Sequence, residues 1–147
     1  MSAQSLTPQE THDLLFSNPK VVYLDVRTVA EFSAGHPKGK VVNIPILFRH
    51  PTTNDTYPNT SFLEVVQSLY ATDAPLIVGC EKGPRAQKAV EQLQQAGYTN
   101  ICIMTAGHAG WREQKLPSTT DNRDGISYVS LLTPVKRKGK KKAATHA

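Results

Sequence analysis

One cysteine of this chain stands where its chemistry could be used. Residues 74–79 form a short apolar run of strand length, and residues 84–96 have apolar side chains at helical spacing. Cys80 lies between them, at the start of the loop Cys80-Glu81-Lys82-Gly83-Pro84-Arg85. Backbone N–H groups and the helix dipole at such a loop favour an anion, and they favour thiolate over thiol. The sequence therefore predicts a nucleophilic sulfur that handles an anionic substrate.

The charged residues of the loop act on the same anion. Lys82 and Arg85 add positive charge, whereas Glu81 opposes it unless its side chain points outward. Pro84 suits the first position of a helix, but it lacks an N–H group that could contact the anion. Cys80 could instead be a small buried hydrophobic residue, which is the role of most lone cysteines. The polar, turn-forming residues after it favour a sulfur near the surface instead.

The charge of the chain is concentrated at one end. The chain has 147 residues, enough for one domain, and a formal net charge of +5. Six of the 17 basic residues lie in 136–142, so the remaining 11 nearly balance the 12 acidic residues. We expect residues 136–147 to form a disordered basic tail. The 136–142 run could contact nucleic acid or another polyanion, act as a nuclear-import signal, or do nothing specific.

The number of cysteines and the hydropathy of the chain indicate in which cellular compartment the protein is expected. Cys80 and Cys102 are too few for a disulfide framework, and neither has metal-type spacing. Cys102 lies in the apolar run 100–104 and is expected to be structural. No apolar run reaches the ~20 residues of a membrane span, and the first residues show no signal-peptide pattern. We therefore expect an intracellular monomer, cytoplasmic by default, with the nucleus or an organelle left open.

Helical and strand patterns alternate along the chain. Capping-box patterns predict helix starts at Thr7 with Glu10, Thr28 with Glu31, and Ser61 with Glu64. Apolar runs predict strands at 21–24, 41–44, 76–79 and 101–104. This order indicates an α/β fold, a mostly parallel sheet covered by helices on both faces. Sites in such sheets form at the carboxyl ends of strands, which is where Cys80 falls.

The remaining segments are predicted to be less regular. Residues 47–60 form a polar loop that could be a pocket wall. Residues 118–125 resemble a linker, and 126–132 could add a short strand. We divide the chain into a domain at 1–117, a C-terminal extension at 118–135 that could pack on it, and the basic tail at 136–147.

Three motifs, in the right order, resemble those of the single-domain rhodaneses, closest in pattern to the small plant-type ones. The first is Leu24-Asp25-Val26-Arg27, with Glu31-Phe32, Gly35-His36 and Asn43-Ile44-Pro45 after it. The second is Gly79-Cys80 through Arg85, and the third is Ala106-Gly107-His108-Ala109-Gly110-Trp111. The resemblance covers roughly residues 6–117. The departures are at 40–42, at His108 in place of a common glycine, and at Ala86 in place of a frequent serine.

The resemblance implies a five-stranded sheet and sulfur transfer. Cys80 would take a sulfane sulfur from a small anionic donor such as thiosulfate, become a persulfide, and pass the sulfur to cyanide, a thiol or a protein acceptor. The substrate-binding residues implied by the loop are Glu81, Lys82, Gly83, Pro84, Arg85 and Ala86. Arg85 would steady the loop or the anion, or hold the loop closed through a salt bridge. No metal and no organic cofactor is required.

The flanking motifs are expected to be mainly structural. Asp25, Arg27 and Glu31 are predicted to form buried ionic braces, and His36 to satisfy backbone groups in a turn. Trp111 is expected to pack beneath the loop. His108 could line the pocket.

Two other functions stay open. A non-catalytic or persulfide-carrier module would dock a partner through the pocket rim or the tail. A phosphatase or arsenate reductase would place a cysteine and an arginine around an oxyanion in the same way. The four residues between Cys80 and Arg85 are one fewer than such relatives use, which argues against this last function.

Overall fold

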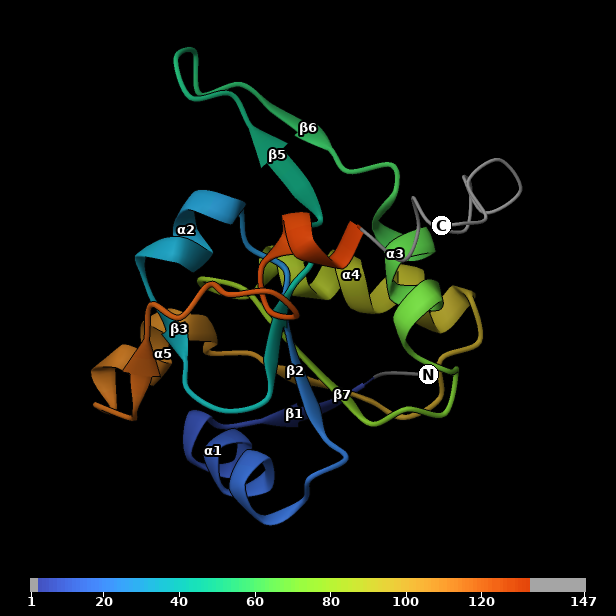
Figure 1. The fold of residues 1–147 in the computed structure, drawn as a ribbon. Coiled ribbons are helices and arrows are strands. Elements are labelled where there is room, and N and C mark those ends of the chain that lie inside the picture. Colours follow the sequence, from blue (N-terminus) through green and yellow to red (C-terminus); the bar gives the residue numbers. More distant parts are fainter. Residues whose placement is uncertain (1–2, 133–147) are drawn as a thin grey trace.

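The centre of the protein is a five-stranded parallel sheet (Figure 1). The computed structural model describes residues 3–132. The strand order is β1 (Gln4–Leu6), β8 (Ile101–Met104), β7 (Leu76–Gly79), β2 (Val22–Asp25) and β4 (Val41–Asn43). Every neighbouring pair is parallel. The expected α/β fold is confirmed, and the central sheet is parallel throughout.

Helices cover both faces of this sheet. The larger apolar core lies under α3 (Phe62–Leu69) and α4 (Pro84–Gln95). The smaller core lies under α1 (Pro8–Ser17), α2 (Val29–Ala34) and α5 (Gly107–Glu113). Alternate residues of β2 supply the two cores: Leu24 points into the larger one and Tyr23 into the smaller one, as the period of a strand requires.

Two of the three predicted capping boxes are present. The side chains of Thr7 and Thr28 each accept a hydrogen bond from the backbone three residues on, and the glutamates there bond back. Ser61 makes no such bond, because its backbone (φ −97°, ψ 4°) is not in the extended conformation that a capping side chain usually needs. The Asn59 side chain instead accepts a hydrogen bond from the Ser61 N–H at 3.0 Å.

Three sequence predictions need correction. The fifth strand of the sheet is β1, whose three residues give too short a pattern to be recognised. The expected loop at 47–60 contains a hairpin, β5 (Leu47–Arg49) with β6 (Thr56–Pro58), which extends away from the body of the domain (Figure 1). The expected strand at 126–132 is wrong, because residues 128–132 are helical. Their buried residues, Tyr128 and Leu131, have the i, i+3 spacing of a helix.

Residues 118–132 contact the rest of the domain at several points. Strand β9 (Ser118–Thr119) pairs antiparallel with β3 (His36–Pro37). The Asn43 N–H donates to the Ile126 carbonyl oxygen at 3.0 Å. The boundaries at 117 and 135 stay a prediction, and the basic run 136–142 lies outside the described residues. Within residues 3–132, no helix is long and apolar enough to cross a membrane.

Candidate active site

Cys80 lies directly after β7, in the loop that leads into α4. The loop turns back over the sulfur, and the Gly83 N–H donates a hydrogen bond to Cys80 Sγ at 2.9 Å. Gly83 adopts φ +117°, a conformation that favours glycine. The expectation of a sulfur near the surface is wrong, since Cys80 is only 1% exposed and belongs to the larger core. The loop itself and the elements packed around it cover the residue.

The start of α5 supports this loop from behind. The His108 N–H donates to the Cys80 carbonyl oxygen at 2.7 Å, and the Ala109 N–H donates to that of Glu81 at 3.1 Å. Gly107 has φ +66°, and a Cβ there would lie 2.3 Å from the Glu81 carbonyl oxygen. Only glycine allows the two backbones this approach, which gives the motif at 106–111 a structural reason.

A buried arginine joins the first motif to the loop. The Arg27 guanidinium binds Asp25 Oδ2 at 2.9 Å and Glu81 Oε1 at 3.2 Å. It also donates to the Gly35 carbonyl oxygen at 2.6 Å. Burial acts to lower the pKa of Arg27, but the hydrogen bond and charge of Asp25 raise it above its usual value. The predicted brace between Asp25 and Arg27 is confirmed.

Glu31 pairs with the far end of the loop instead of joining that brace. Arg85 Nη1 and Nη2 contact its two carboxylate oxygens at 2.6 and 3.0 Å. Of the roles left open for Arg85, the salt bridge that ties the loop to α2 is therefore formed. Partial burial acts to raise the pKa of Glu31, but Arg85 and the bonds from Thr28 lower it to about 2. A carboxylate this acidic stays charged at neutral pH.

The other predicted loop residues have distinct surroundings. Glu81 is turned toward Arg27 and toward Arg112 of α5. The hydrogen bond from Arg112 is the main cause that lowers the pKa of Glu81. Lys82 and Pro84 are exposed, whereas Ala86 is fully buried in the larger core.

Two residues of the third motif beyond Gly107, His108 and Trp111, are buried. Trp111 is fully buried in the smaller core, and its Nε1–H donates to the Pro117 carbonyl oxygen at 2.9 Å, which confirms its packing role. His108 is 2% exposed. Burial, together with the positive charges of Arg27 and Arg112, lowers the pKa of His108 to about 4. Its imidazole is therefore neutral at pH 7.

His36 holds backbone groups, as the sequence predicts. Its Nδ1 lies 3.0 Å from the Pro37 carbonyl oxygen and its Nε2 lies 2.7 Å from that of Asp121. The ring also stacks on Phe32, with the ring centroids 3.7 Å apart. These contacts fix the turn between α2 and β4 and attach residue 121 to it.

Sequence reasoning missed the role of Arg112. Its partner Glu81 is 31 residues away in the chain, so no local pattern indicates the pair. The only signal is its position directly after Trp111, on a helix that the third motif places against the loop.

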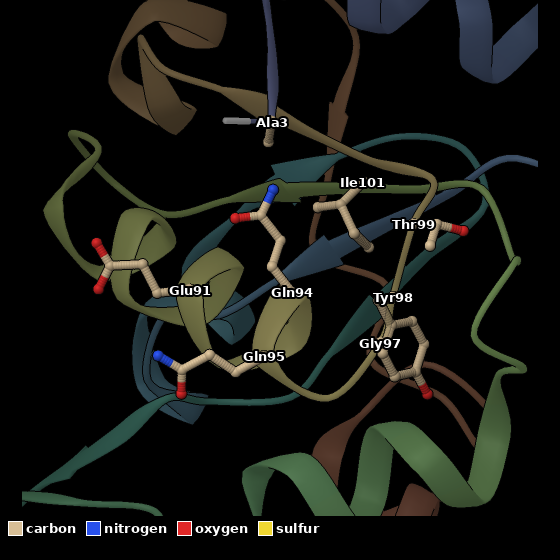
Figure 2. Close-up of a pocket in the computed structure, with 8 residues that line it drawn as sticks. All are labelled: Ala3, Glu91, Gln94, Gln95, Gly97, Tyr98, Thr99 and Ile101. Atoms are coloured by element: carbon tan, nitrogen blue, oxygen red, sulfur yellow. The ribbon is translucent and has the colours of Figure 1, made fainter. Parts of the chain in front are cut away.

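Figure 2 shows a cavity of about 470 Å³ that Cys80 does not line. Its lining residues include Gln94 and Gln95 at the end of α4, together with Tyr98, Thr99 and Ile101. The Cys80 loop adjoins the opposite, amino-terminal end of the same helix. Within the described part of the chain, no group of three or more His, Cys, Asp or Glu side chains is arranged to hold a metal ion.

Comparison with known proteins identifies the family. The Rhodanese-like domain matches residues 7–114. The chain belongs to the rhodanese family. The match contains the Cys80 loop, both arginines that hold Glu81, and the glutamate that holds Arg85. The expected resemblance, based on the three motifs, is therefore confirmed.

Individual relatives of this rhodanese domain include plant and bacterial proteins. The chain is 37% identical over 114 residues to Thiosulfate sulfurtransferase 16, chloroplastic, of Arabidopsis thaliana, covering 78% of this chain and 91% of that one. It is 30% identical over 120 residues to Thiosulfate sulfurtransferase GlpE of Haemophilus influenzae, covering 82% and 98%. It is also 37% identical over 89 residues to Protein HIGH ARSENIC CONTENT 1, mitochondrial, of Arabidopsis thaliana, covering 60% and 51%.

A solved structure shows the same fold. The crystal structure of Rv0390 from M. tuberculosis superposes with a TM-score of 0.67 at 26% identity, covering 82% of this chain and all of that one. The five-stranded rhodanese fold is therefore confirmed.

The close approach at Gly107 yields the first prediction. Gly107→Ala should lower the free energy of unfolding by about 2–4 kcal/mol, because a new Cβ adds overpacking against the loop backbone to the strain of a positive φ. Gly97→Ala is the matched control, since Gly97 has φ +95° and nothing within 4 Å of the Cβ position. Urea unfolding measures both variants. Equal losses in the two variants would contradict the proposed contact between α5 and the loop.

The pair between Glu31 and Arg85 yields a pH prediction. The pKa of Glu31 is about 2 in the folded protein, against an ordinary value of 4.5 for a glutamate side chain. Its charge therefore stabilises the fold above about pH 4.5, and this contribution is lost as the pH falls toward 2. Because both side chains are partly exposed, we expect the wild type to lose about 1 kcal/mol more than Glu31→Gln between pH 5 and pH 3.

Urea unfolding at the two pH values tests this, with Glu64→Gln as the control. Glu64 is an exposed glutamate of α3 that forms no salt bridge with the described residues. Parallel acid sensitivity of Glu31→Gln and the wild type would show that the pair contributes nothing.

Proposed function

We propose that this rhodanese domain is a sulfurtransferase that carries a sulfane sulfur on Cys80. The donor is thiosulfate or a similar small anion, and the acceptor is cyanide, a thiol or a protein cysteine. The observation that carries the proposal is the loop amide of Gly83, which donates to Cys80 Sγ at 2.9 Å. A sulfur held at the end of a strand by a backbone donor is suited to bear negative charge. Two relatives named thiosulfate sulfurtransferase support this donor.

In the first half of the reaction, the Cys80 thiolate attacks the outer sulfur of thiosulfate. A new sulfur–sulfur bond forms on Cys80, and the bond within thiosulfate breaks. The electron pair of that bond leaves with sulfite, and Cys80 becomes a persulfide anion. Its terminal sulfur carries negative charge, which N–H donors of the loop can stabilise.

In the second half, the acceptor attacks the terminal sulfur of the persulfide. With cyanide, a carbon–sulfur bond forms, thiocyanate leaves, and the electron pair of the broken sulfur–sulfur bond returns to Cys80 as thiolate. Neither half needs a proton, because sulfite and the thiolate both leave as anions. This chemistry requires no general base.

The ion pairs around the loop hold it in the reactive arrangement. Arg85 is anchored to α2 through Glu31, and Glu81 is anchored through Arg27. The Cys80 and Glu81 carbonyl oxygens are bound from behind by α5. A loop fixed in this way keeps its backbone donors in place before the donor arrives, so little reorganisation is needed during the reaction.

Arsenate reduction or phosphate-ester hydrolysis is the second candidate. The name of the relative Protein HIGH ARSENIC CONTENT 1 favours testing it. The loop argues against it, because only four residues separate Cys80 from Arg85, and Arg85 is engaged by Glu31 on both of its terminal nitrogens. A third possibility is a carrier that accepts sulfur on Cys80 and releases it only to a protein partner. We propose that any polyanion contact is made through the 136–142 run.

Thiocyanate formation from thiosulfate and cyanide tests the proposal. We expect the wild-type chain to turn over and Cys80→Ser to lose at least 1,000-fold in rate (about 4 kcal/mol of transition-state stabilisation), because the serine hydroxyl cannot form the persulfide. Cys102→Ser is the matched control and should retain the wild-type rate, since Cys102 lies within β8. Parallel assays with arsenate plus a thiol, and with a phenyl phosphate ester, should show no turnover.

Two results would contradict the proposal. Undiminished turnover in Cys80→Ser would place the chemistry elsewhere. Wild-type turnover of arsenate or phosphate ester, with none of thiosulfate, would favour the second candidate.

A further inference from the structure

The active-site loop carries an acidic residue directly beside the nucleophile. A free Glu81 carboxylate would repel the anionic donor that Cys80 must meet. The structure engages this carboxylate from two sides. Its Oε1 lies 3.2 Å from Arg27 Nη1 and 3.4 Å from Arg112 Nη1, and its Oε2 is bound by Arg112 Nη2.

The two arginines differ in what else they hold. Arg27 is almost fully buried, and its guanidinium already binds Asp25 through three hydrogen bonds. The negative charge of Asp25 therefore balances most of the positive charge of Arg27, which leaves little to offset that of Glu81. Arg112 is half-exposed, and Glu81 is its only carboxylate partner among residues 3–132. Arg112 is thus the residue whose charge offsets that of Glu81.

The charges around Cys80 can be compared as a set. Three of these side chains are carboxylates, those of Asp25, Glu31 and Glu81. Four are cationic, those of Arg27, Lys82, Arg85 and Arg112. The site therefore has one excess positive charge, and loss of Arg112 would remove it. Lys82 forms no salt bridge with any residue of the described chain.

We propose that Arg112 is a positioning residue that sets the charge preference of the site. By holding and neutralising Glu81, it lets a doubly charged sulfur donor approach Cys80. The choice of sulfur donor rests on the function proposed above. The proposed effect of Arg112 on the charge of the site applies to any anion that approaches Cys80.

The proposal predicts an effect that depends on donor charge. Thiosulfate carries two negative charges and releases sulfite, whereas the methanethiosulfonate anion carries one, offers an outer sulfur of the same kind and releases methanesulfinate with the electron pair of the broken sulfur–sulfur bond. The Coulomb energy between a side chain and a donor is proportional to the donor charge. Loss of Arg112 should therefore change the logarithm of the rate about twice as much for thiosulfate as for the thiosulfonate.

The test measures kcat/KM for both donors, with cyanide as acceptor, at low salt. Arg112→Gln should lower the value about fivefold for thiosulfate and about twofold for methanethiosulfonate. Both losses should shrink at 0.5 M salt, where screening is strong. The double variant Glu81→Gln/Arg112→Gln has the wild-type net charge at the site, so it should be faster than Arg112→Gln with thiosulfate, and any remaining loss, from the weaker hold of Arg27 on the loop, should be equal for the two donors. A merely structural role of Arg112 would give neither the charge dependence nor this rescue.

Lys20→Gln is the control for net charge. Lys20 is exposed and precedes β2, at the amino end of the parallel strands, whereas the loop follows the carboxyl end of β7. The Lys20→Gln substitution removes one positive charge, as Arg112→Gln does, and should leave the rates with both donors unchanged. Equal losses for the two donors in Arg112→Gln, or a double variant no better than Arg112→Gln alone, would overturn the proposal.

A second readout does not depend on sulfur transfer. The alkylation rates of Cys80 by anionic iodoacetate and neutral iodoacetamide give a ratio that reports the local charge. Arg112→Gln should lower this ratio and Glu81→Gln should raise it. If thiosulfate gives no turnover but the ratio moves this way, the proposed function fails while the charge effect stands. An unchanged ratio in both variants would overturn the charge effect itself.

Discussion

The ion pair between Arg27 and Asp25 is the interaction on which the site depends. Both side chains are buried at the end of β2, and the guanidinium reaches from there to α2 and to the active-site loop. Removal of one partner from a buried pair typically costs about 3–5 kcal/mol, because an uncompensated charge is left behind. The same arginine therefore ties the fold of the domain to the position of the loop that carries Cys80.

The loop is held from three directions, twice by an ion pair and once by backbone hydrogen bonds. Arg27 holds Glu81 by charge, Glu31 holds Arg85 by charge, and α5 holds the loop backbone through amide donors. Because these contacts come from the segment after β2, from α2 and from α5, the three sequence motifs meet at one place. A rigid loop of this kind suits a reaction in which the nucleophile and its product both carry negative charge on sulfur.

The sequence predicted what local patterns encode. The correct predictions rest on residues that are close together in the chain. They are the strand before Cys80, the capping boxes at Thr7 and Thr28, and the brace between Asp25 and Arg27. The failures have physical causes: β1 is too short for a pattern, and Ser61 has a backbone that prevents capping. The pairing of Glu81 with Arg112 could not be predicted, since it exists only once α5 packs against the loop.

The most direct test of the account is to locate the transferred sulfur. The wild-type protein would be treated with thiosulfate, freed of excess donor, blocked at its thiols, digested and analysed by mass spectrometry. The account predicts one added sulfur atom on the peptide that contains Cys80 and none on the peptide that contains Cys102. A thiosulfate-treated protein that turns over without added sulfur on Cys80, or that carries it on Cys102, would contradict the central claim.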